Sequence, residues 1–220
     1  MSITYTTEDL RIQPADQEAT ASDMKIVARN AKLAGHFSVM EGEVRPGEIL
    51  AFHTHQNEDQ HMYIIEGELH FEVGGAGGLR FTARAGDHVL KPRGSSHGFW
   101  NPTKHTARYI ETSTQDGFER FVDARAEGIS TMIGGAAESL GMSFEHARTL
   151  EVMKEFELDG MAGANLSDPQ ALLRDPGLLE LLRTDAAARE LIFYLGGAKL
   201  ESSVKGLLGR LDPRARAGAC

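Results

Sequence analysis

Two histidines separated by one residue, His53 and His55, are the strongest chemical signal in the sequence. Alternate residues of a β-strand point to the same face, and a strand rises about 3.3 Å per residue, so the two imidazoles can converge on one metal ion. Neutral imidazole binds zinc, copper, iron and nickel. Such a pair also arises by chance on the polar face of a surface strand, so the pair alone is weak evidence for a metal site.

The residues on both sides of this pair form two ordered blocks. The first block, residues 47–68, reads GEILAFHTHQNEDQHMYIIEGE, and the second, residues 86–101, reads GDHVLKPRGSSHGFWN. The two blocks resemble the two conserved motifs of the cupin superfamily. The first follows the pattern G-x5-H-x-H-x4-E-x6-G, except that Gln60 occupies the glutamate position. The second follows G-x5-P-x-G-x2-H-x3-N throughout.

The resemblance implies a mostly β fold, a single antiparallel cupin (jelly-roll) β-barrel over residues 24–114. An N-terminal arm would precede the barrel at residues 1–23, and an α-helical C-terminal extension would follow it at residues 115–220. The resemblance also implies one divalent metal ion at the mouth of the barrel. Its ligands would be His53, His55 and His97.

Gln60 departs from the family pattern, because most metal-binding cupins have a carboxylate at this position. An amide oxygen is a weaker, neutral ligand, so Gln60 could coordinate the metal or only hydrogen-bond to a ligand or a water. Glu58 or Asp59 could supply a carboxylate instead if the local loop shifts, and we expect Gln60 and Glu58 to be the catalytic candidates. His61 could become a ligand only through a register slip that inverts the whole strand.

Strand alternation also predicts the wall of a substrate pocket beside the metal. Counting inward from the proposed ligands along their strands gives apolar residues, which are the usual lining of a small-molecule site. The same residues could instead be ordinary barrel core. The predicted pocket residues are Ile49, Ala51, Met62, Ile64 and Phe99.

Short apolar runs separated by turn signals predict the strands that would position these residues. Examples are the runs at residues 24–28, 36–40, 62–65 and 69–73. Beyond Asp116 the pattern becomes helical. We expect helices at residues 118–124, 144–156 with Ser143 as N-cap, 178–182 and 186–195, and Asp168–Pro169 and Asp175–Pro176 as two further helix starts.

Composition narrows the class of protein. The 220 residues carry 23 Lys and Arg against 32 Asp and Glu, a net charge of −9, which disfavours nucleic acid as a partner. The single cysteine, Cys220, excludes an intrachain disulfide framework. No signal peptide or long apolar segment is visible, so we expect a cytoplasmic protein with no membrane partner.

A looser resemblance extends to the quercetin-dioxygenase-like single-cupin proteins, many of which are bacterial. It implies a dioxygenase that acts on a small phenolic, enolic or diketone-like substrate with Fe, Ni or Mn. The alternatives are a non-redox isomerase, lyase or polyketide cyclase that uses Zn, and a small-molecule-binding cupin without turnover. Cupins commonly dimerise through their sheets, so we expect a homodimer.

Overall fold

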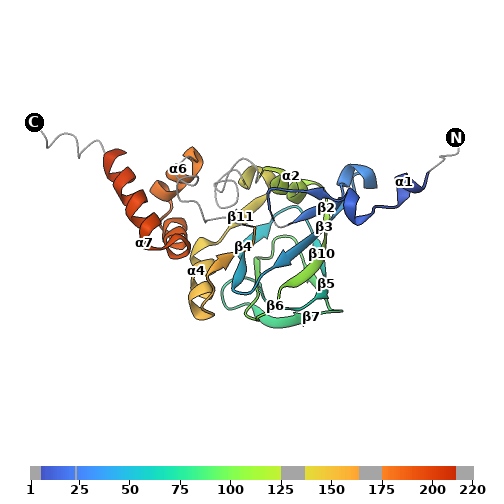
Figure 1. Cartoon of the computed structure of the whole chain (residues 1–220), viewed down its shortest axis with the longest axis horizontal. Coiled ribbons are helices and arrows are strands. Elements are labelled where there is room, and N and C mark those ends of the chain that lie inside the picture. Colours follow the sequence, from blue (N-terminus) through green and yellow to red (C-terminus); the bar gives the residue numbers. More distant parts are fainter. Residues whose placement is uncertain (1–5, 23, 125–136, 164–174, 212–220) are drawn as a thin grey trace, which may run out of the picture.

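Two mostly antiparallel sheets form the centre of the molecule (Figure 1). The computed structural model describes residues 6–22, 24–124, 137–163 and 175–211. Within these ranges one sheet has the strand order β1-β2-β3-β10-β5-β8, and the other has the order β11-β4-β9-β6-β7. A short strand, β12, adds to β4 in parallel. This arrangement fits the jelly-roll fold that the sequence predicts.

The bounds of the elements are as follows. The strands are β1 (Glu18–Ala19), β2 (Lys25–Ala28), β3 (Phe37–Val44), β4 (Glu48–His55), β5 (Gln60–Glu66), β6 (Glu68–Val73), β7 (Leu79–Arg84), β8 (His88–Lys91), β9 (His97–Trp100), β10 (Ala107–Thr114), β11 (Met142–Phe144) and β12 (Gly160–Met161). The helices are α1 (Thr7–Leu10), η1 (Pro14–Asp16), η2 (Asn30–Leu33), α2 (Gly117–Ala124), η4 (Glu138–Leu140), α4 (His146–Glu155), α6 (Pro176–Thr184) and α7 (Ala186–Leu211).

Strands β3, β5, β8 and β10 of the first sheet bury every second residue, because alternate side chains point to the covered face of the sheet. Strand β10 alternates strictly between buried and half-buried residues along its whole length. The interior is closely packed where β10 meets β3. An added Cβ at Gly42 would lie 2.5 Å from the ring of Tyr109, so only glycine leaves room for that ring.

Aromatic side chains join the two sheets in the interior. Phe99 of β9 lies 5.2 Å from Phe71 of β6 and 5.6 Å from Tyr109 of β10, measured between ring centroids. All three rings are buried. Such contacts between facing sheets stabilise the barrel and fix the distance between its walls.

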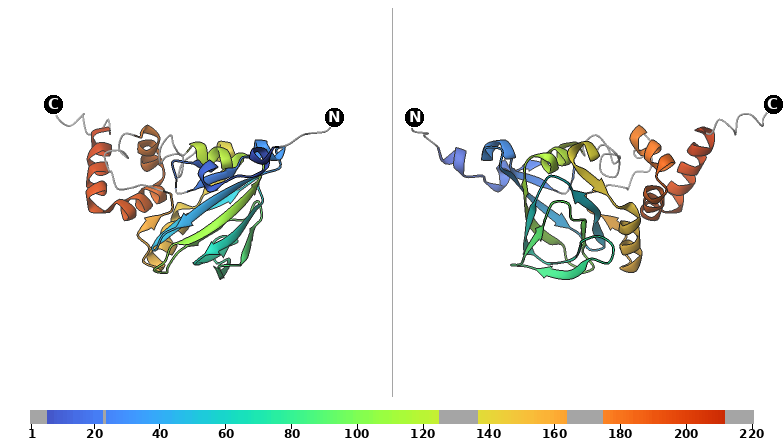
Figure 2. Two further views of the ribbon diagram at one scale, coloured as in Figure 1. Left: turned by 45° about the vertical axis from the view of Figure 1, so that its right-hand side comes forward. Right: turned by 180° about the vertical axis from the view of Figure 1, so that it is seen from behind.

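Helix α4 covers the outer face of the second sheet, the face that points away from the first sheet. Arg148 of α4 donates to the fully buried carboxylate of Glu72 on β6, and the Thr149 hydroxyl accepts a hydrogen bond of 2.9 Å from the Phe52 amide. His146 of α4 pairs with Asp185, the residue between α6 and α7, at 2.9 Å. Figure 2 shows α6 and α7 grouped beside α4, at the opposite end of the molecule from α1.

Most of the predicted elements are confirmed, but the predicted start and N-cap of one helix are wrong. The predicted helix at residues 144–156 begins only at His146, and Ser143 is not its N-cap. Residues 142–144 instead form β11, where Ser143 pairs with Thr54 at the edge of the second sheet. The chain reaches the sheet before it can start the helix, so sheet pairing overrides the local cap signal.

The other helix predictions differ in outcome. Asp175 caps α6 by accepting from the Leu178 amide, and Pro176 occupies the first turn, as predicted. The helix predicted at residues 186–195 continues to Leu211, with a non-helical residue at Gly197. The predicted start at Asp168–Pro169 and the single cysteine, Cys220, lie outside the described residues. None of the helices in the described ranges combines the length and apolar character that a membrane crossing requires.

Candidate metal centre

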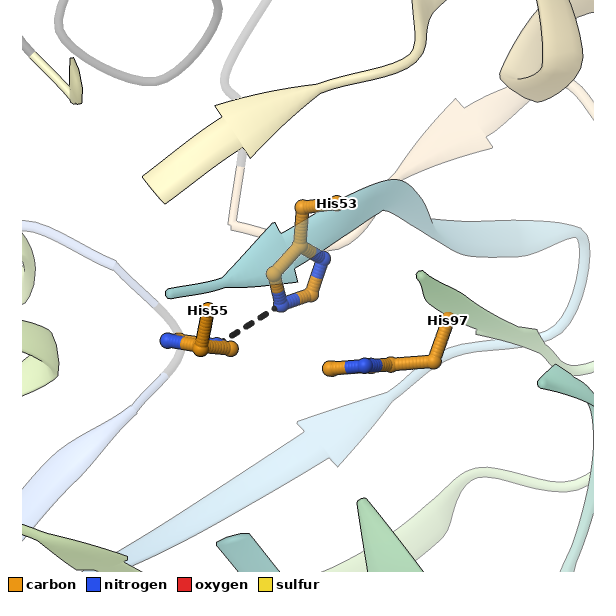
Figure 3. A group of neighbouring side chains, drawn as sticks. All are labelled: His53, His55 and His97. Carbon is orange, nitrogen blue, oxygen red and sulfur yellow. Dashed lines mark hydrogen bonds between the residues drawn. The ribbon is translucent and has the colours of Figure 1, made fainter. Parts of the chain in front are cut away.

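Three buried histidines meet inside the barrel (Figure 3). His53 and His55 come from β4, and His97 comes from the neighbouring strand β9, where it stands directly opposite His53. The potential ligand atoms of the three rings all lie within 4.8 Å of one another. The exposed fraction of each residue is at most 2%. The antiparallel pairing of β4 with β9 therefore brings together residues that are far apart in the sequence.

Hydrogen bonds fix which nitrogen of each ring faces the cluster. Nδ1 of His53 lies 2.7 Å from the carbonyl oxygen of Ala51, and Nδ1 of His97 lies 3.0 Å from that of Ser95. A carbonyl oxygen only accepts, so both Nδ1 atoms must donate. In a neutral ring the Nε2 atom then carries a lone pair, which is the arrangement that metal-binding histidines show in proteins.

His55 has the same orientation through a side chain. Its Nδ1 lies 3.1 Å from Oε2 of Glu58, so its Nε2 also turns toward the cluster. Nε2 of His55 and Nε2 of His53 are 3.0 Å apart, and Nε2 of His97 has no hydrogen-bond partner among the described residues. Three converging lone pairs repel one another unless a cation lies between them. The donor set therefore fits a divalent metal ion.

The electrostatic surroundings keep the three rings neutral. Burial is the largest cause that lowers the pKa of His53 and of His97 well below the ordinary value, and it lowers the pKa of His55 to about 3. The positive charge of Lys91 lowers all three values further. Protons therefore compete weakly for the ring nitrogens, which leaves them available to a metal.

Glu58 lies behind His55 rather than at the centre of the cluster. Its carboxylate contacts Nδ1 of His55 through Oε2 and accepts a 2.8 Å hydrogen bond from the Phe118 amide, in the first turn of α2, through Oε1. Burial raises the pKa of Glu58 to about 7, although hydrogen bonds from the amides of Phe118 and Gly117 lower it. The structure thus gives Glu58 the role of orienting His55, and its catalytic role stays a prediction.

Gln60, the first residue of β5, is buried in the facing sheet. Neither its amide oxygen nor its amide nitrogen has a hydrogen-bond partner among the described residues. Buried amides are normally hydrogen-bonded, because leaving one unpaired costs about 1–3 kcal/mol. These two atoms are therefore available to a water or to a bound group inside the barrel. Coordination of a metal by Gln60 stays a prediction.

An apolar cavity of about 30 Å³ adjoins His53. It is lined by Met24, Leu50, Ala51, His53, Phe118, Phe121, Met142, Phe144, Met161 and Ala162. Of the predicted pocket residues, only Ala51 lines this cavity. Ile49, Met62, Ile64 and Phe99 are fully buried in the hydrophobic core instead. Contact of these residues with a substrate stays a prediction.

The alternation that we used to place Ile49 is interrupted in β4. The register of β4 against β9 shifts between Leu50 and His53, so that Leu50 stands opposite Phe99 and Ile49 stands opposite Trp100. A β-bulge of this kind adds a residue to one strand and changes which side chains share a face. Leu50, which the alternation assigns to the other face, therefore lines the cavity beside His53.

Sequence reasoning missed a buried ion pair in the same interior. Nζ of Lys91, the last residue of β8, lies 2.7 Å from Oε1 of Glu111 on β10. Lys91 follows the apolar Val89 by two residues on β8, so strand alternation places both side chains on the inner face. Charged residues are almost never fully buried unless they are paired, and only the fold reveals the partner 20 residues away.

The chain was compared with protein-family profiles, curated proteins and solved structures. Residues 40–113 match the family profile described as a cupin domain. A search of curated proteins found no match.

Three of the solved structures that match this chain are as follows. A predicted oxalate decarboxylase from Thermotoga maritima is 18% identical, with a TM-score of 0.41 over 48% of this chain and 99% of that one. The polyketide cyclase RemF from Streptomyces resistomycificus is 20% identical, with a TM-score of 0.37 over 52% and 80%. A protein from Bacillus halodurans is 18% identical, with a TM-score of 0.36 over 37% of this chain, which spans 64% of that protein's length.

The family match covers the strands that carry all three histidines, and the two facing sheets have the jelly-roll arrangement. Residues 40–113 therefore form a domain of the cupin superfamily.

Proposed function

We propose that this chain is a metal-dependent enzyme that acts on a small organic substrate, and that its reaction is a dioxygenation. The observation that carries the proposal is the set of three buried imidazoles whose Nδ1 atoms are hydrogen-bonded and whose Nε2 atoms converge. A histidine with a purely structural role does not need its Nε2 atom to point toward the same position as the Nε2 atoms of two other rings. A centre with three protein ligands leaves positions for a substrate, as catalytic metal sites do.

The residues of the chain have distinct roles in this proposal. His53, His55 and His97 hold the ion, and Glu58 keeps His55 in the ligating tautomer. A divalent metal bound there supplies Lewis-acid chemistry and, if it is iron, nickel or manganese, access to redox chemistry with O2. The ring of Phe118 lies 5.3 Å from the His55 ring and gives the centre an apolar neighbour.

Two features favour an oxygenase with an enolic, phenolic or diketone-like substrate. Three neutral imidazoles leave the charge of a divalent ion uncompensated, which favours a substrate oxygen that carries negative charge. The cavity beside His53 is lined mainly by Phe, Met and other apolar residues, and apolar surroundings favour O2 over water beside the histidines.

A non-redox isomerase, lyase or cyclase with zinc is the second candidate. The observation that favours it is the neutral amide of Gln60 at the position where a carboxylate is expected. Among the described residues, the group of potential ligands also contains no carboxylate. A Lewis acid that only polarises a carbonyl group does not need one.

The test begins with the metal content of the purified full chain, measured by elemental mass spectrometry. His53→Ala should remove the metal, whereas His105→Ala, which changes an exposed histidine outside the cluster, should not. Stoichiometric iron, nickel or manganese together with O2 uptake on a β-diketone or phenol supports the dioxygenase. Equal turnover with and without O2 supports the second candidate, and absence of metal after reconstitution refutes both.

The remaining expectations are part of the proposal. A small molecule is the expected partner, nucleic acid and membranes are not, and the protein is expected to be a cytoplasmic, bacterial homodimer. Light scattering on the purified chain tests whether the protein is a homodimer, because a dimer has twice the 24.0 kDa mass of one chain.

A further inference from the structure

A row of buried polar side chains faces the interior from the first sheet. Lys91, Gln60, Ser113 and Ser38 are successive register neighbours across β8, β5, β10 and β3. Each has an exposed fraction of 3% or less. Barrel interiors are usually filled by apolar side chains, so an unbroken polar row requires an explanation.

Lys91 is the only cation in this row. Its Nζ lies 2.7 Å from Oε1 of Glu111 and 5.4 Å from the centroid of the Phe99 ring. Among the described residues, Glu111 is its only hydrogen-bond acceptor. An ammonium group has three N–H donors, so Lys91 retains donors for another acceptor.

The Lys91 ammonium and the three histidines share one interior. Phe99, whose ring lies beside Lys91, is two residues beyond His97 on the same strand, so the two side chains share a face. The charge of Lys91 also acts on all three histidines. A metal ion at the histidines would therefore have a second positive group near it.

A buried ion pair is by itself weak evidence of a stabilising role. Replacing a buried ion pair by apolar residues of similar volume is often neutral or stabilising, because both ions lose their hydration when they are buried. Beside Lys91, both polar atoms of the Gln60 amide lack a partner among the described residues. An occupant with an anionic oxygen could accept from both side chains.

We propose that Lys91, assisted by Gln60, binds an anionic oxygen of the substrate (an enolate, phenolate or carboxylate oxygen), while another oxygen of the same molecule faces the three histidines. The proposal rests on the proposed function, because it needs a metal at His53, His55 and His97. Glu111 is a positioning residue, since its carboxylate holds the ammonium inside the barrel. The substrate class is therefore a small anion with two oxygens that can be bound at once.

The test measures ligand binding to the cobalt(II)-loaded full chain by the change in the visible absorption of the cobalt. The anionic probe is pentane-2,4-dione, which binds metals as its enolate, and the uncharged probe is imidazole. Lys91→Met removes the charge but leaves Glu111 buried and unpaired, which can unfold the protein. The double variant Lys91→Met/Glu111→Gln removes both charges. Arg148→Met is the matched control, because it removes a cation from a buried carboxylate on the outer side of the second sheet.

We expect the double variant to raise the Kd of the enolate about tenfold to hundredfold, the range for a lost hydrogen bond to a charged group, and to leave the Kd of imidazole unchanged. Arg148→Met should change neither Kd. Equal enolate affinity in the double variant and the wild type overturns the proposal. So does a double variant that cannot fold or load cobalt, because the pair is then structural. Failure of the wild type to bind cobalt refutes the proposed function itself.

Discussion

Replacing Glu58 by glutamine should weaken metal binding without changing a single ligand atom. The carboxylate accepts from Nδ1 of His55 at 3.1 Å and from the Phe118 amide at 2.8 Å. A glutamine that keeps its oxygen on the Phe118 amide must turn its NH2 group toward Nδ1. Two donors then face each other, and His55 relieves the conflict by moving its proton to Nε2. That tautomer cannot bind the metal.

The expected loss of metal affinity follows from the position of Glu58, which is hydrogen-bonded to one of the three proposed ligands. Loss of a hydrogen-bond partner behind a metal-binding histidine costs about 10–100-fold in metal affinity, or about 1.4–2.7 kcal/mol. We expect a loss in this range for zinc, measured by competition with a chromophoric chelator at pH 7.5. The fold should survive, because a glutamine oxygen still accepts from the first turn of α2.

The neighbouring residue supplies the control. Asp59→Asn makes the same change in charge one position away, where the carboxylate pairs with Arg93 on the surface and does not touch His55. Its zinc affinity should equal that of the wild type. Equal affinities for all three proteins would refute the tautomer argument, and an equal loss in both variants would show that only net charge matters.

Three further substitutions test the centre and the strands that hold it. His97→Ala should reduce the bound metal to background in elemental mass spectrometry, while the far-UV circular dichroism keeps its β-sheet signal. Gly98→Ala would place a Cβ 2.7 Å from the ring of Phe52, and we expect a loss of about 1–3 kcal/mol in urea unfolding. Asn101→Ala removes a 2.8 Å hydrogen bond to the Val44 carbonyl in a fully buried position, so the free energy of unfolding should fall by about 1–3 kcal/mol.

Local patterns were sufficient to predict most of the elements. The apolar run at residues 69–73 became β6, and the helical spacing at residues 118–124 became α2. Ser143 shows where local patterns fail, because its preference for a helix cap is weaker than the pairing offered by the edge of β4. The preference of one residue for a helix cap amounts to about 1 kcal/mol, and at Ser143 the pairing of three successive residues with β4 prevails over it.

The site was predictable to the extent that spacing encodes it. The two motif-like blocks identified His53, His55 and His97, which the fold brings together. The face occupied by Ile49 was not predictable, since one extra residue in β4 changes the alternation and no residue type marks the shift. Lys91 was missed because a lysine without a known partner is assigned to the surface. Its partner, Glu111, lies on another strand, and only the folded sheet brings the two residues together.

The charges inside the barrel connect the proposed metal centre with the proposed role of Lys91. The three imidazoles are neutral, the amide of Gln60 is neutral, and Lys91 and Glu111 form an ion pair that adds no net charge to the interior. Glu58 contacts a ring nitrogen on the far side of His55, so its charge lies farther from the centre than that of a coordinating carboxylate would. A divalent ion held at the histidines would keep most of its charge, and burying an uncompensated charge is costly. An anionic substrate removes this cost, and Lys91 fixes where its second oxygen binds. Affinity for anionic ligands should therefore exceed affinity for uncharged ligands of the same shape, and the excess should shrink when the Lys91 charge is removed.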